Sequence, residues 1–176
     1  VDPRYRALAE KITADLPGET KDAPFARALA IKLYLDEHMT YSTRERHAGA
    51  EDPTASFLFG SLVGYCVHSA HAAVYLMRTL GLPARIGTGY FVAESERRGS
   101  ALLLQTNQAH AWPEVYLDGA GWVVVDVTPS EILDEPGDPV DEDLLDQLEE
   151  LARQEQDPLM PPEERPIEKL RRASRW

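Results

Sequence analysis

The sequence has little cysteine, an excess of acidic over basic charge and no long apolar run. Its single cysteine, Cys66, excludes an internal disulfide framework and any iron–sulfur or all-cysteine zinc site. No apolar run approaches the ~20 residues that span a membrane, and no N-terminal stretch has the layout of a signal peptide. The net charge of −12 argues against nucleic acid as a partner, because binding phosphates requires a basic surface.

What is present indicates one domain with an appendage. The 176 residues are 43% hydrophobic, enough for one sizeable core. Negative charge is concentrated in residues 131–157, which carry twelve acidic side chains and one basic one. We therefore predict a domain over 1–130 and an extension over 131–176, made of an acidic amphipathic helix and a basic end. The chain begins at Val1 rather than Met, so we expect it to be a piece of a longer protein.

The first part of the chain is predicted to be helical, over residues 5–15 and 24–39. In the second helix, apolar residues recur at three- and four-residue steps. Its buried face is predicted from Phe25, Leu29 and Leu33. Asp22 is the expected N-cap, with Pro24 in the first turn. Residues 42–56 are polar and are predicted to form a surface loop.

A third helix is predicted to begin at Cys66 and to end at Gly81 and Pro83. Its apolar stripe comprises Val67, Ala70, Val74, Met77 and Leu80. Strands are predicted over 84–92, 101–106, 110–117 and 121–128, and the last two are joined by the hairpin signal "DGAG". Because helices precede most of the strands, the pattern is typical of an α+β fold with an antiparallel sheet.

Cys66 is the first candidate for chemistry. A thiol at a helix N-terminus lies near unpaired N–H groups, and we expect that position to lower its pKa. A nucleophilic cysteine also requires a base and an acceptor that orients the base. His110 and Asp126 lie on the two strands of the predicted hairpin.

The hairpin register decides whether these two side chains meet. A three-residue loop, 118–120, places Trp112 opposite Asp126 and His110 opposite Thr128, so that His110 and Asp126 are diagonal neighbours. A two-residue loop would put them on opposite faces. Pro113 cannot donate to the ladder, and we expect its nitrogen to face no partner or a bulge.

The segments "GYCVHSAHAAVYLMRTLGLPARIGTGY" and "HAWPEVYLDGAGWVVVDVTP" closely resemble the core of the transglutaminase-like superfamily. The resemblance covers residues 57–130. The matching residues beyond the three named above are Arg78, Gly81, Leu82, Pro83, Ala84, Arg85, Gly89, Tyr90, Ala111, Trp112, Glu114, Val115, Gly121, Trp122, Thr128 and Pro129. Similar domains lie on the outer side of the bacterial cytoplasmic membrane.

The resemblance implies a papain-like fold, with helices packed on an antiparallel sheet. It also implies a triad of Cys66 as nucleophile, His110 as base and then acid, and Asp126 as the orienting group. The reaction would be acyl transfer from a protein or peptide amide through a thioester. Tyr65, His68 and Trp112 are the predicted substrate contacts, and the Cys66 N–H is a candidate oxyanion donor, with Tyr65 as the second. No cofactor or metal is expected.

The residues by themselves leave open other roles for Cys66 and for the protein. Cys66 could be a buried structural thiol, or a zinc ligand with His68, His71 and His110. The enzyme could be a peptidase or amidase that passes the thioester to water, and a silent binding module could keep the fold.

Lesser expectations concern other side chains and the setting of the protein. His38 and His47 are expected to be solvated, Arg85 to pair with Glu114, and Trp112 and Trp122 to serve mainly in packing. The resemblance favours an extracytoplasmic location within a larger membrane-anchored protein.

Overall fold

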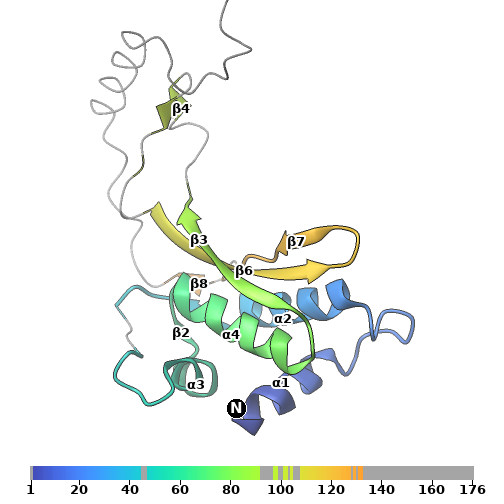
Figure 1. The fold of residues 1–176 in the computed structure, drawn as a ribbon. Coiled ribbons are helices and arrows are strands. Elements are labelled where there is room, and N and C mark those ends of the chain that lie inside the picture. Colours follow the sequence, from blue (N-terminus) through green and yellow to red (C-terminus); the bar gives the residue numbers. More distant parts are fainter. Residues whose placement is uncertain are drawn as a thin grey trace, which may run out of the picture. The chain divides into compact units, whose positions relative to one another are not determined.

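The computed structural model describes residues 2–44, 47–91, 97–98, 101–102, 104, 108–127, 129 and 131–132. The chain divides into two units, one of residues 1–90 with 109–136 and one of residues 91–108 with 137–176. In the second unit, the described residues include the short antiparallel pair β4 (Arg97–Arg98) and β5 (Ala101–Leu102). The first unit holds the helices and the main sheet, and it has the predicted α+β class (Figure 1).

In the first unit, the helices precede the main sheet, and two short strands lie between helices in the sequence. The helices are α1 (Pro3–Thr13), α2 (Pro24–His38), α3 (Pro53–Ser56), the π-helical turn η1 (Phe57–Ser61) and α4 (Cys66–Thr79). The strands are β1 (Thr40–Tyr41), β2 (Val63–Gly64), β3 (Ala84–Tyr90), β6 (Ala109–Leu117), β7 (Gly121–Val124) and β8 (Glu131–Ile132). The predicted helices and the hairpin strands are therefore confirmed, with ends shifted by a few residues.

Helix α4 is the centre of the core, because α1 and α2 pack on it and it also contacts β3 and β6. Ala70, Val74 and Met77 are buried as the predicted stripe requires. Val67 is wrong as a stripe member, since its side chain is exposed. The helix ends as expected, because Gly81 takes a φ of 79° and the Leu82 N–H donates to the Met77 carbonyl at 3.0 Å.

The buried face of α2 differs from the prediction. Phe25 and Leu33 are 48% and 54% exposed. The buried residues are Ala28, Ile31 and Leu35. This helix carries apolar residues on most of its sides, so their spacing could not identify the buried face. The packing against α1 and α4 decides which face is buried.

The N-terminus of α2 also differs from the prediction. The N-cap is Ala23 and makes no side-chain capping bond, so Asp22 is wrong as the cap. Pro24 begins the helix, where a missing N–H costs nothing.

The main sheet has the strand order β3–β6–β7 and is antiparallel. In the hairpin, Glu114 pairs with Val124 and Tyr116 with Trp122. This is the register of the three-residue loop, and it confirms the prediction. Gly119 and Gly121 permit the loop by taking φ values of 83° and 80°.

A second small sheet, missed by the sequence analysis, has the order β2–β1–β8 and is parallel. Its strands are two residues long, too short to leave a periodic signal. The Ser42 N–H donates to the Gly64 carbonyl at 2.7 Å, which secures the chain just before Cys66. β8 begins directly after the predicted domain boundary at 130. The rest of the predicted extension, 133–176, lies outside the described residues.

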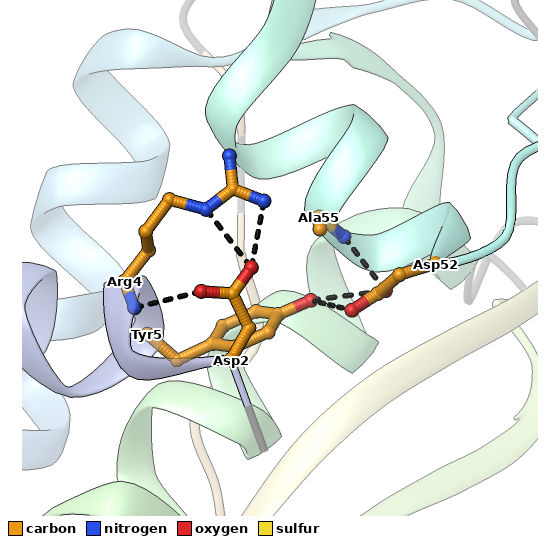
Figure 2. Close-up of polar contacts among 5 residues, drawn as sticks. All are labelled: Asp2, Arg4, Tyr5, Asp52 and Ala55. Atoms are coloured by element: carbon orange, nitrogen blue, oxygen red, sulfur yellow. Dashed lines mark hydrogen bonds and ion pairs between the residues drawn. The ribbon is translucent and has the colours of Figure 1, made fainter.

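Tyr5 ties α1 to the loop before α3 (Figure 2). Its hydroxyl donates to the two carboxylate oxygens of Asp52 at 3.1 and 3.0 Å. Asp52 also caps α3 by accepting the Ala55 N–H at 2.9 Å. Burial and the Asp52 carboxylate raise the pKa of Tyr5 above its usual value, so the phenol stays a donor.

Replacing Tyr5 with Phe should lower the free energy of unfolding by about 1–3 kcal/mol, because the buried ring loses a hydrogen bond to a carboxylate. Urea unfolding followed by circular dichroism measures this change. Tyr116→Phe is the matched control, since it removes a hydroxyl from a ring that is 41% exposed. Equal stability of the two variants would contradict this role for Tyr5.

Candidate active site

Cys66 is the first residue of α4, following Tyr65 as the N-cap, and its side chain is partly buried. Burial raises the pKa of the thiol. Hydrogen bonds from the backbone N–H groups of Ala111 and Val67 act in the opposite direction but do not outweigh burial. The expectation that the helix N-terminus alone lowers this pKa is therefore wrong, because desolvation of the thiolate dominates. A thiolate here requires a nearby cation.

His110 is bonded to Asp126. Its Nε2 lies 2.8 Å from Oδ2 of Asp126. A carboxylate only accepts, so Nε2 carries the proton and Nδ1 is the basic nitrogen of the neutral ring. The Asp126 charge also acts on Cys66, raising its pKa. Asp126 therefore bonds His110 and also acts on the Cys66 thiol through its charge.

Pro113 explains how the chain leaves the strand near Asp126, the residue that bonds His110. The Val125 N–H donates to the Pro113 carbonyl at 2.9 Å, but proline has no N–H to return a bond, and β7 ends at Val124. The chain thus leaves the ladder at Asp126. The N–H of Ala111, two residues before Pro113, faces the same edge, and it acts to lower the pKa of the Cys66 thiol.

The side chains next to His110 on the outer face of the sheet bond one another. The Trp112 Nε1–H donates to Oε1 of Glu114 at 3.1 Å, and Nε of Arg85 donates to Oε2 at 2.6 Å. Arg85 lowers the pKa of Glu114 most, followed by Trp112. The Arg85–Glu114 pair is confirmed, and the guanidinium lies 4.1 Å from the ring centroid of Trp122.

Trp112 lies on the glycines of β3. It is paired with Gly87, and a Cβ on Gly87 would overlap its indole. The indole ring centroid is 5.9 Å from that of His110. Packing is therefore one role of Trp112, as expected for a tryptophan, and its contact with substrate stays a prediction.

Tyr65 and His68 meet at the start of α4. The Tyr65 N–H donates to Nδ1 of His68 at 3.2 Å, so this N–H is already engaged and is a poor choice for an oxyanion donor. The cavity beside them has a volume of about 560 Å³. It is lined by Ala48, Glu51, Asp52, Pro53, Thr54, Tyr65, Val67, His68, His71 and Tyr75. Substrate binding by Tyr65 and His68 stays a prediction.

His47 is buried, at 6% exposure, so the expectation of a solvated side chain is wrong. Its Nε2 lies 2.9 Å from the Val63 carbonyl and its Nδ1 lies 3.0 Å from Oγ of Ser56. A carbonyl only accepts, so Nε2 donates and Nδ1 of the neutral ring accepts. The polar loop gave no signal for this role, because the contact is made across sixteen residues of sequence. His38 is exposed, as predicted.

The zinc alternative finds no support in the part of the chain that the structure describes, where no group of three or more His, Cys, Asp or Glu side chains could hold a metal ion. Nδ1 of His71 donates to the Val67 carbonyl at 2.8 Å instead. Among the described helices, none is long and apolar enough to cross a membrane.

Residues 6–127 match the family model of the transglutaminase-like superfamily. The chain belongs to this superfamily. The match extends beyond the motif core at 57–130 to include the N-terminal helices, so α1 and α2 are part of the family fold.

Two curated relatives are bacterial. The chain is 34% identical to a protein-glutamine gamma-glutamyltransferase of Pseudomonas aeruginosa over 128 residues, 72% of this chain and 18% of that protein. It is 36% identical to the uncharacterized protein YebA of Bacillus subtilis over 132 residues, 71% of this chain and 17% of that protein. The chain thus spans less than a fifth of the length of either relative.

A solved structure agrees with this superfamily assignment. The periplasmic domain of TgpA from Pseudomonas aeruginosa matches with a TM-score of 0.59 and 32% identity. The match covers 71% of this chain and 42% of that one. The papain-like, transglutaminase-like fold predicted from the sequence is confirmed.

Alkylation of Cys66 by iodoacetamide should depend on His110. In His110→Ala, the thiol keeps a pKa raised by burial and loses the imidazole that is predicted to be its base. Alkylation at pH 7 should fall by about tenfold or more and recover only as the pH rises well above 8.5. Rate constants from pH 5 to 10, followed by mass spectrometry, test this. His71→Ala serves as the control, because it removes an imidazole that bonds the Val67 carbonyl instead of Asp126. Identical profiles for the wild type and His110→Ala would contradict the pairing.

Replacing Gly87 with Ala should destabilise the sheet by about 1–3 kcal/mol, because the new methyl group would overlap the Trp112 indole. Thermal unfolding measures the loss. Gly49→Ala is the matched control, since a Cβ there has no atom within 4 Å. If both variants unfold at the same temperature, the packing of Trp112 against β3 is not a stabilising contact.

Proposed function

We propose that Cys66, His110 and Asp126 form the catalytic triad of an enzyme that transfers the acyl group of a protein glutamine to an amine. The observation that carries this proposal is the 2.8 Å bond between His110 Nε2 and Asp126 Oδ2, together with the effect of the Asp126 charge on the pKa of the Cys66 thiol. The glutamyltransferase named above supports the choice of a glutamine carboxamide as the acyl donor.

In the first half-reaction, His110 takes the Cys66 proton at Nδ1 and becomes an imidazolium beside the thiolate. Asp126 stabilises this cation and holds the ring in one orientation. The thiolate attacks the carboxamide carbon, forming a C–S bond and an oxyanion. The N–H groups at the α4 N-terminus, Cys66 first, are candidates to stabilise that oxyanion.

Collapse of the tetrahedral intermediate breaks the C–N bond. His110 gives its proton to the leaving nitrogen, and ammonia departs from the thioester. In the second half-reaction, an amine attacks the thioester and His110 accepts its proton. The C–S bond then breaks, leaving an isopeptide bond, and His110 returns the proton to Cys66.

The setting proposed for this activity is outside the cytoplasm. The solved TgpA domain is periplasmic, and a protein or peptide substrate there would suit a domain carried by a larger membrane-anchored protein. The triad alone does not choose between an amine and water as the acceptor. Hydrolysis of the same thioester is therefore the competing reaction in the test.

The test supplies a glutamine-containing peptide and a labelled primary amine to the 176-residue chain. We expect amine incorporation with release of ammonia, abolished in Cys66→Ala. Asp126→Ala should lower the rate by about 10²–10⁴-fold, because the imidazolium loses its carboxylate. Asp118→Ala, an exposed carboxylate in the hairpin turn, should leave the rate unchanged.

Ammonia release without amine incorporation would assign the chain to the hydrolases instead. Reactivity toward neither acceptor, with Cys66 still alkylated normally, would indicate a binding module and overturn the proposal.

A further inference from the structure

Two histidine rings hold the three residues that lead into Cys66. His47 donates from Nε2 to the Val63 carbonyl at 2.9 Å, and His68 accepts the Tyr65 N–H on Nδ1 at 3.2 Å. The two rings are themselves in edge contact, with centroids 4.9 Å apart. The backbone of Val63, Gly64 and Tyr65 is thus bonded at both ends by imidazoles.

Gly64 makes this arrangement possible. A Cβ on Gly64 would lie 2.7 Å from Nδ1 of His68 and 3.1 Å from the Phe57 ring. The His68 ring therefore packs directly on the Gly64 backbone. Phe57 stacks on the same ring with centroids 5.7 Å apart, and Tyr65 contacts its edge at 4.4 Å. His68 is held in place by aromatic contacts, so its Nδ1 has a defined role.

The bond from Tyr65 specifies the protonation of His68. An N–H group donates, so Nδ1 must carry no proton, and the neutral ring carries its proton on Nε2. Protonating Nδ1 would set an N–H against the Tyr65 N–H and leave a partly buried donor without its acceptor. The bond therefore exists only while His68 is neutral.

We propose that His68 is a positioning residue, which holds the peptide before Cys66 when neutral and releases it when protonated. This inference rests on the proposed function only in taking Cys66 as the reacting group. Acid would then lower the reactivity of Cys66 through His68, in addition to the effects of Cys66 and His110 themselves.

The groups around His68 act on its charge in both directions. Glu51 and Asp52 line the same cavity and favour the imidazolium. His47 in edge contact and His71 on the same cavity wall disfavour it whenever they are charged, and the Phe57 ring and the Tyr65 phenol contribute no charge near neutral pH.

Substituting His68 with Asn or with Ala distinguishes the loss of the hydrogen-bond acceptor from the loss of its protonation. Asn places a carbonyl oxygen close to the position of Nδ1 and cannot be protonated, whereas Ala has no acceptor. The experiment measures Cys66 alkylation by iodoacetamide from pH 5 to 8 in the wild type, His68→Asn and His68→Ala. Titration of Cys66 and His110 is common to all three, so the ratios of the rates isolate His68.

At pH 8 we expect His68→Asn to react like the wild type and His68→Ala about fivefold more slowly, the value of one hydrogen bond. At a pH below ~6.5, the pKa of an ordinary histidine, His68→Asn should be alkylated about fivefold faster than the wild type. The rates of His68→Ala and the wild type should become similar there. The control is His38→Asn, which replaces an exposed histidine whose Nδ1 bonds the Tyr34 carbonyl, and it should follow the wild type throughout.

Hydrogen exchange of the Tyr65 amide gives a second readout. Protection beyond the intrinsic pH dependence should fall on acidification in the wild type and persist in His68→Asn. A pH-independent ratio of His68→Asn to the wild type, or equal impairment of His68→Asn and His68→Ala at pH 8, would overturn the proposal. Alkylation needs no acyl transfer, so a failure of the glutamine assay with these ratios intact would refute the proposed function alone.

Discussion

The ladder between β6 and β7 ends because Pro113 has no N–H to donate, and the arrangement of the site depends on this. Val125 gives its N–H to the Pro113 carbonyl and receives no bond in return, so the chain is free to leave the sheet at Asp126. Its carboxylate bonds Nε2 of His110, and this carboxylate and the Ala111 N–H act on the pKa of the Cys66 thiol in opposite directions.

The site combines a buried thiol with a polar surround, and the two have opposite effects on the thiolate. Desolvation and the Asp126 charge disfavour it, while backbone N–H groups stabilise it. In the proposed mechanism Cys66 gives its proton to His110, and the orientation of His110 by Asp126 is then a requirement of the chemistry.

Several features could be predicted because they depend on short stretches of chain. The alternation of side chains along two strands showed that a three-residue turn is required to place His110 and Asp126 on one face, and the structure has that turn, with Gly119 and Gly121 at positive φ. The face of α2 could not be predicted, because Phe25 and Ile31 are equally apolar and only the neighbouring helices distinguish them. His47 was missed for a similar reason, since its partners, Ser56 and Val63, lie nine and sixteen residues away.

The sequence by itself determined the family and the identity of the three candidate catalytic residues, because both depend on local spacing and on short motifs. The tertiary structure decided the thiol environment and the two-imidazole support of the segment before Cys66. Both depend on how much water is excluded and on which distant groups are brought together. Neither quantity is a property of a short stretch of chain, since burial and long-range hydrogen bonds exist only once the helices have packed on the sheet.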